Sequence, residues 1–136
     1  MPDTIRLVDY YYVMTADRPG EGARVLGHLK DAGVNLLAFH AFPSGRRAQL
    51  NLVPSDAAAL RAAARKAKWK LVGPKKAFLL TGDDRTGALV DHYNKLAQAK
   101  INVVATDAVA VSGYYGAILW VGPRDVKKAA QILGAV

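Results

Sequence analysis

The spacing of apolar residues along this chain predicts an alternation of strands and helices. The β-branched and aromatic residues of Ile5–Met14 are typical of a strand. Val25, Leu26 and Leu29 then follow helical spacing. Gly33 is expected to end this helix, because glycine readily adopts the left-handed conformation found after the last helical residue. A strand followed by a helix therefore opens the chain.

A hairpin and a second helix are expected next. Asn35–Phe42 and Arg46–Val53 have the composition of strands and are separated by a turn sequence. The alanine-rich segment of about Asp56–Lys68 favours a helix that begins at a capping residue. Leu71-Val72 predicts a last strand, and the Gly73-Pro74 pair predicts a break after it. The order is thus strand, helix, two strands, helix and strand.

The second half of the chain repeats this order. Asp17–Leu36 recurs without a gap as Asp84–Val103, 67 positions later, with Asp, Arg, Gly, Leu, Ala and Asn at the same places. The elements expected in this copy are the strand Ala77–Leu80, a helix carrying Leu89, Tyr93 and Leu96, the strands Val103–Val111 and Tyr115–Val121, and the helix Arg124–Leu133. No strand is predicted after that last helix.

Two copies of one unit indicate an α+β fold. We expect two tandem ferredoxin-like βαββαβ modules, residues 1–73 and 74–136, each an antiparallel sheet with helices on one face. The second module lacks its last strand, unless a strand from elsewhere in the assembly supplies it. The edge strand Ala77–Leu80 is apolar, so we expect it to be covered. Leu36–Phe42 is apolar on both faces, which predicts a homodimer that covers the face without helices.

Positive charge is concentrated in one stretch of the chain. The formal net charge is +8, and nine of the 19 Lys and Arg residues lie between Arg46 and Lys76, where Asp56 is the one acid. Such a stretch could meet phosphates or an acidic protein. Only Trp69 could stack on a nucleic-acid base there. A solvated basic face is therefore expected in preference to a nucleic-acid site.

Several classes of site are excluded by residue type. With no cysteine, the chain has no disulfide, thiolate nucleophile or cysteine metal site, and we expect a reducing, cytoplasmic location. The longest uncharged stretch, Ala108–Pro123, has 16 residues, fewer than the roughly 20 that span a bilayer. His28, His40 and His92 are scattered without metal-ligand spacing and are expected to be exposed or interfacial. A nucleophile elbow and a P-loop are absent. We therefore predict a protein that is no enzyme and needs no metal or cofactor, with no membrane partner.

The most informative motif follows the first strand. It reads Asp-Arg-Pro-Gly-x-x-Ala-x-Val-Leu-x-x-Leu-x-x-Ala-Gly-Val-Asn from Asp17 to Asn35, and a hairpin follows it. This arrangement resembles the ACT domain; the second copy fits more loosely, with Thr86 in place of Pro and Lys100 in place of Gly. ACT domains are small ferredoxin-like modules that bind amino acids or similar metabolites and regulate metabolic enzymes. The resemblance implies a free-standing tandem regulatory protein with an amino-acid-like ligand, a second copy and a metabolic enzyme as partners.

The resemblance also implies where a ligand binds, between the loop after the first strand and the start of the second. The matching positions are Asp17, Pro19, Gly20 and Asn35 in the first copy and Asp84, Gly87 and Asn102 in the second. A helix amino terminus attracts a ligand carboxylate, an aspartate accepts from its ammonium group, and asparagine can do both. Glu21 disfavours an anion at the first helix, whereas its counterpart Ala88 does not, so the two sites should differ.

Other interpretations of these residues remain open. Asp17 and Asp84 could serve only as helix caps, and the glycines and asparagines could serve only in turns. Arg18 and Arg85 are expected to be solvated. A different function also fits the composition: a scaffold whose basic Arg61–Lys76 surface binds an acidic protein or nucleic acid. Ionic strength would separate the two functions, because phosphate binding weakens steeply with added salt.

Overall fold

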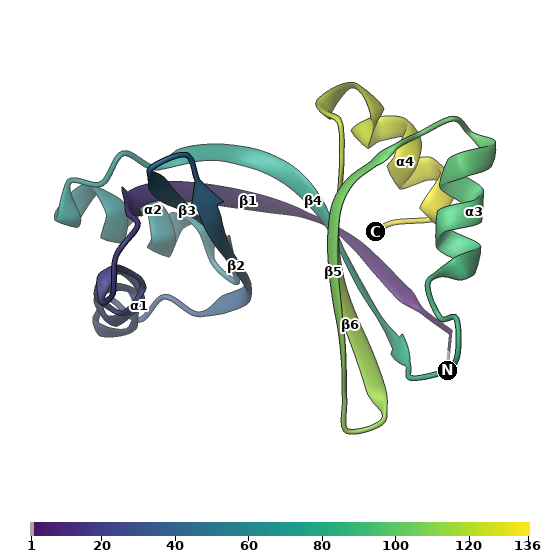
Figure 1. The fold of residues 1–136 in the computed structure, drawn as a ribbon, viewed down its shortest axis with the longest axis horizontal. Coiled ribbons are helices and arrows are strands. Elements are labelled where there is room, and N and C mark those ends of the chain that lie inside the picture. Colours follow the sequence, from purple (N-terminus) through teal and green to yellow (C-terminus); the bar gives the residue numbers. More distant parts are fainter. Residues whose placement is uncertain (1) are drawn as a thin grey trace. The chain divides into compact units, whose positions relative to one another are not determined.

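The computed structural model describes residues 2–136. Six strands form an antiparallel sheet in the order β2-β3-β1-β4-β6-β5, with four α-helices (Figure 1). The elements are β1 (Thr4–Ala16), α1 (Glu21–Asp31), β2 (Leu36–Ser44), β3 (Arg47–Pro54), α2 (Ala57–Ala67), β4 (Val72–Asp83), α3 (Val90–Gln98), β5 (Val103–Val111), β6 (Tyr114–Val121), the short 3-10 helix η1 (Pro123–Asp125) and α4 (Val126–Leu133). In the described part of the chain, no helix is both long and apolar enough to cross a membrane.

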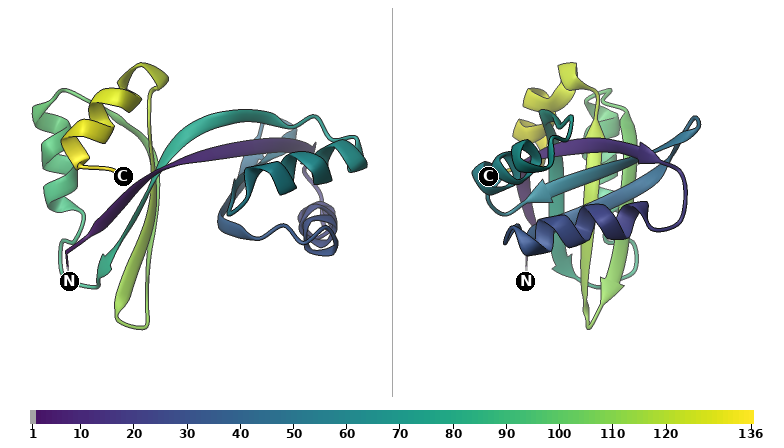
Figure 2. Two further views of the ribbon diagram at one scale, coloured as in Figure 1. Left: turned by 180° about the vertical axis from the view of Figure 1, so that it is seen from behind. Right: turned by 90° about the vertical axis from the view of Figure 1, so that its left-hand side faces the viewer.

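One compact unit is formed by Asp9–Lys75. It contains most of β1, the hairpin β2-β3, the beginning of β4 and the helices α1 and α2, which lie on one face of these strands (Figures 1 and 2). Apolar side chains from the strands and both helices are buried together between the two layers. The buried residues of this core are Tyr11, Val13, Val25, Leu29, Val34, Leu50, Leu52, Leu60 and Ala63.

The second compact unit combines the chain up to Val8 with Lys76–Val136. Here the beginning of β1 lies beside β4, and β6 and β5 follow, while α3 and α4 cover one face (Figure 1). The buried residues of this core are Ile5, Phe78, Leu80, Leu96, Ile101, Tyr115, Ala117, Leu119, Val121, Ala129 and Leu133. Each unit therefore has its own core of one helical layer on one sheet layer, as an α+β fold requires.

The last strand of the second unit comes from the start of the chain. The backbone N–H of Leu7 donates to the carbonyl of Val136, and the N–H of Val136 donates to the carbonyl of Ile5, both at 3.0 Å. The apolar Ala77–Leu80 segment lies in this unit with Ala77 and Phe78 fully buried. No strand follows α4, as predicted, and β1 takes the missing place.

The two units also correspond in register. In the first, Thr15 of β1 lies opposite Ala48 of β3. In the second, Gly82 of β4 lies opposite Tyr115 of β6. Both pairs are related by the same 67-residue offset as the sequence repeat. Residues 67 positions apart in these strands therefore occupy equivalent places in the two units.

The helix starts differ from prediction. Asp56 caps α2 as expected, its Oδ1 accepting from the N–H groups of Ala58 and Ala59 at 3.0 and 3.3 Å. Asp17 and Asp84, in contrast, cap no helix: α1 is capped by Gly20 at φ 91° and α3 by Leu89, neither with a side-chain hydrogen bond. The caps move because the backbone first makes a turn, in which the N–H of Ala88 already donates to the carbonyl of Arg85 at 3.2 Å.

The break predicted at Gly73-Pro74 is wrong, because β4 runs continuously from Val72 to Asp83. The Gly73-Pro74 peptide is cis, and Gly73 has φ 137°. A Cβ atom at residue 73 would lie 2.7 Å from Cδ2 of Tyr11 and 2.9 Å from the carbonyl oxygen of Tyr10. Glycine at this place thus allows two strands to approach closely, and the pair does not interrupt the strand.

Candidate functional site

A pocket of about 340 Å³ lies beside the loop between β4 and α3, within the second unit. Two of the predicted ligand residues, Asp84 and Gly87, line it. Its other walls come from the start of α3, from the middle of β5 and from one tyrosine of β6. These residues are Ala88, Leu89, Val90, Ala108, Val109, Ala110 and Tyr115. The pocket therefore has mostly apolar walls and one carboxylate at its rim.

Backbone hydrogen bonds hold the loop that forms this pocket. The N–H of Asp84 donates to the carbonyl of Gly113 at 3.0 Å, and the N–H of Val90 donates to the carbonyl of Gly87 at 2.9 Å. Gly87 has φ 72°, and a Cβ atom there would lie 3.3 Å from Cγ2 of Val90. Glycine is favoured at this position because a side chain would be strained and would crowd the pocket wall.

A cluster of four polar side chains lies next to this pocket and was missed by the sequence analysis. The carboxylate of Asp3 accepts hydrogen bonds from Arg85 at 3.1 and 3.0 Å, from the hydroxyl of Tyr115 at 2.9 Å and from Nε2 of His92 at 2.6 Å. Because the carboxylate only accepts, the proton of His92 is on Nε2. Only 8 % of the Asp3 side chain is exposed. The cluster thus satisfies a buried negative charge completely.

These contacts change the proton affinities of the cluster. The hydrogen bond from Arg85, with those from His92 and Tyr115, holds the pKa of Asp3 well below its ordinary value of 3.8. Burial and the neighbouring Asp3 carboxylate raise the pKa of Tyr115 to about 12. The cluster therefore keeps a charged aspartate and a neutral tyrosine over the whole neutral range.

Two interpretations made from the sequence are corrected by this cluster. His92 was expected to be exposed or interfacial, yet its side chain is buried against Asp3. Arg85 was expected to be solvated, yet it forms a two-pronged ion pair with Asp3 although 46 % of its side chain is exposed. The sequence carried no signal for either contact, since 82 and 89 residues separate the partners.

The loop of the first unit has a different environment. Asp17, Pro19 and Gly20 are exposed. Glu21, at the start of α1, pairs with Nε of Arg24 at 3.0 Å, and this hydrogen bond lowers the pKa of Glu21. A carboxylate already occupies the helix start here, whereas the second unit has Ala88 in its place.

The two predicted asparagines lie away from these loops. Asn35 follows α1, whose 11 residues separate it from Gly20 by about 16 Å. Asn102 precedes β5, and the six residues from Asn102 to Ala108 of the pocket extend about 20 Å. Within one unit the loop and the asparagine therefore do not meet. A site that uses both needs an asparagine from another module.

The described residues offer no evident metal site. Within residues 2–136, no three His, Asp or Glu side chains gather closely enough to hold an ion. His28, on α1, contacts the carbonyl of Ala63 at 3.0 Å through Nε2.

Solved structures share this fold at low sequence identity. A protein from Bacteroides thetaiotaomicron matches with a TM-score of 0.83 at 13 % identity, over 96 % of this chain and 88 % of that one. The ligand-free regulatory subunit of aspartate kinase from Thermus thermophilus matches with a TM-score of 0.66 at 12 % identity, over 98 % of this chain and 96 % of that one. The chain has an ACT-like fold. No protein-family model and no curated protein matches the sequence.

The structural matches also cover most of the length of the solved chains. The regulatory subunit from Thermus flavus, at 15 % identity and a TM-score of 0.58, is also covered over 95 % of its length. The ACT-like arrangement therefore extends over nearly all of the chain and nearly all of these regulatory subunits.

Proposed function

We propose that this chain is a non-catalytic regulatory protein that binds an amino acid or a related small carboxylate. The observation that best supports this proposal is that the ACT-like fold of the chain matches regulatory subunits of aspartate kinase over nearly their whole length. In this proposal the two ACT-like modules, expected from the sequence at residues 1–73 and 74–136, are the compact units Asp9–Lys75 and the chain up to Val8 with Lys76–Val136. A metabolic enzyme is the regulated partner.

The ligand is assigned to the pocket between the β4–α3 loop and β5. Asp84 at the rim accepts from the ligand ammonium group, and the amide hydrogens near the start of α3 attract its carboxylate. The walls of Ala88, Leu89 and Val109 favour a small aliphatic side chain, since they offer no polar partner. Asn35 or Asn102 from a neighbouring module would complete the site.

A homodimer is part of the proposal. On β5, Val104 and Val109 are 64 % and 63 % exposed, and Leu37 and Phe39 of β2 are also exposed. Exposed apolar side chains of this kind, in either unit, favour association. A second copy that covers β5 would also close the open side of the pocket, which supports a ligand site at a module interface.

Thermal melting against the 20 amino acids and common 2-oxo acids tests the function, with calorimetry on any compound that shifts the melting temperature. A ligand present at about 100 times its Kd should stabilise the fold by about 2.7 kcal/mol. Gly87→Val should then abolish binding. Gly134→Val is the matched control, because Gly134 has a similar φ of 68° in the same unit but open space around it.

A cooperative melt with no shift for any compound would contradict the assignment. Equal binding by the Gly87→Val and Gly134→Val variants would place the ligand elsewhere. Binding of an acidic protein or nucleic acid that weakens steeply with salt would instead support the scaffold with its basic Arg61–Lys76 surface.

A further inference from the structure

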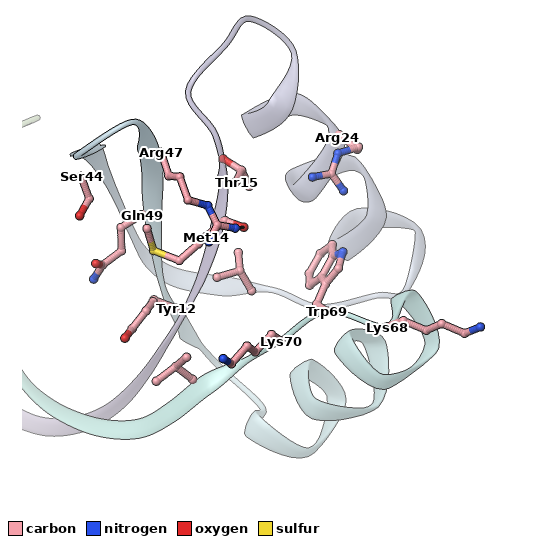
Figure 3. A pocket seen from close by; sticks show the side chains of 12 residues that line it. Tyr12, Met14, Thr15, Arg24, Ser44, Arg47, Gln49, Lys68, Trp69 and Lys70 are labelled. Atoms are coloured by element: carbon pink, nitrogen blue, oxygen red, sulfur yellow. Dashed lines mark hydrogen bonds between the residues drawn. The ribbon is translucent and has the colours of Figure 1, made fainter.

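We propose that a second pocket, in the unit Asp9–Lys75, binds a small phosphate monoester that carries a planar ring, of the nucleoside monophosphate class. This pocket has a volume of about 570 Å³, within the usual range of roughly 300–1,000 Å³ for small-molecule sites. It lies between the end of β1, the β2-β3 hairpin, α1 and the segment that joins α2 to β4 (Figure 3).

The charge of the pocket favours an anion. Arg24, Arg47, Lys68 and Lys70 line it. Arg24 pairs with Glu21, but no carboxylate among residues 2–136 forms an ion pair with Arg47, Lys68 or Lys70. Cations gathered around one hollow repel each other, and a bound dianion relieves that repulsion.

The other unit holds an anion at the equivalent place. Residue 70 corresponds to residue 3 through the 67-residue offset. The carboxylate of Asp3 is there held by Arg85 and the Tyr115 hydroxyl. In the first unit a lysine replaces this aspartate, and the anion has to come from solution.

Smaller side chains also replace the partners of Asp3. Ala48 stands opposite Thr15 where Tyr115 stands opposite Gly82. Val25 occupies the position of His92 in the helix, 67 residues earlier. The space that the tyrosine ring fills in the second unit is therefore not filled by a ring at the equivalent position of the first.

Trp69 provides a surface for the planar ring. Its indole is packed at 5.0 Å and 64° against the ring of His28, which itself contacts the carbonyl of Ala63. The N–H of Trp69 donates to the carbonyl of Ala64 at 2.9 Å, which fixes its backbone at the end of α2. Figure 3 shows the indole of Trp69 below Thr15 of β1 and Arg24 of α1. Ring stacking on a fixed tryptophan tolerates any base, so Trp69 does not select one base over another.

Neutral polar side chains line the rest of the pocket. Ser44 and Gln49 lie with Arg47 on the sheet side, and Lys70 lies on the segment that joins α2 to β4 (Figure 3). Hydroxyl and amide groups of this kind suit a sugar between the phosphate and the ring. This site differs from the proposed amino-acid site in its unit, its charge and its ligand.

Calorimetry with AMP, adenosine and inorganic phosphate, at one ionic strength, tests the proposal. AMP should bind once per chain, and adenosine and phosphate should each bind at least ten-fold more weakly, since each lacks one half of the contacts. Arg47→Ala and Lys70→Ala should weaken AMP binding by about ten-fold each, as expected for a lost hydrogen bond to a charged group.

Matched controls come from neighbouring cations outside the pocket. Arg46→Ala and Lys66→Ala remove the same charges from exposed positions and should change AMP affinity less than two-fold. The indole N–H resonance of Trp69, assigned with Trp69→Phe, should shift on addition of AMP in wild type.

Three results would overturn the proposal. They are absence of AMP binding at low salt, equal binding of phosphate and AMP, and equal weakening by the Arg46→Ala and Arg47→Ala variants. Binding of single-stranded RNA without binding of AMP would assign the surface to a macromolecule instead.

Discussion

Asp3 and Lys70 hold the same place, before the last strand, in the two units of this chain, yet they have opposite charges. Around Asp3 the second unit assembles Arg85, His92 and Tyr115 into a closed cluster. Around Lys70 the first unit leaves an open, cationic pocket. One fold position can therefore hold a structural ion cluster or a binding site, depending on a few side chains, while the backbone register stays the same.

The largest expected effect tests whether the two cores are equivalent. Leu29 and Leu96 are related by the offset and both are fully buried. Replacing either by alanine should lower the free energy of unfolding by about 2–5 kcal/mol, because each change leaves a cavity in a packed core. Urea unfolding of both variants measures this. A loss below about 1 kcal/mol in only one of them would show that the two cores are not comparable.

The next largest effect distinguishes the position of Asp3 from that of Lys70. Asp3→Ala should cost about 2–3 kcal/mol of unfolding free energy, because it leaves His92 and the hydroxyl of Tyr115 buried without their acceptor. Lys70→Ala should be neutral or slightly stabilising, because it removes one of several neighbouring cations. The same urea titration compares them. Equal losses would remove the basis for treating one position as structural and the other as part of a site.

Acidic pH should reduce the difference in unfolding free energy between wild type and the Asp3→Ala variant. The pKa of Asp3 is depressed in the folded protein, so the unfolded chain takes up the proton first as pH falls. The advantage of wild type over Asp3→Ala should be constant at neutral pH and shrink as pH falls below the ordinary value of 3.8. Unfolding free energies measured between pH 7 and pH 2.5 test this. An advantage that shrinks already between pH 7 and pH 5 would indicate that another group controls the cluster.

The smallest expected effect on stability concerns the exposed face of β5. Val109→Ser should change the unfolding free energy by less than about 0.5 kcal/mol, since the side chain is largely exposed. It should nevertheless shift a dimer toward monomer, which sedimentation velocity measures. An unchanged sedimentation coefficient at all concentrations would place the homodimer contact elsewhere.

Elements with a local signal were predicted well. The hairpins, the alanine-rich α2 with its Asp56 cap, and Gly33 at the end of α1 with φ 72° all follow from neighbouring residues. Elements that depend on a distant partner were predicted less well. The Gly73-Pro74 pair is typical of a break in isolation, but the close approach of Tyr11 makes it part of a strand.

The residues of the candidate site differ in the same way: some have a local sequence signal and others depend on distant partners. Asp84 and Gly87 were predicted from the resemblance to the ACT domain and from the repeat, and they line a pocket in the structure. Asp3 and Tyr115 were missed, since nothing near them in the chain points to a cluster. The asparagines matched a family position, but the length of one helix or strand separates each from the loop of its own unit.

The sequence by itself determined the repeat and, apart from the break expected at Gly73-Pro74, the order of elements, because hydrophobic periodicity and turn chemistry act over a few residues. Only the tertiary structure decided that β1 begins as the last strand of the second unit and that Asp3 meets Arg85, 82 residues later. Strand pairing and buried ion pairs join residues that are distant in sequence. Their partners are selected by the space and the hydrogen bonds that the packed fold provides.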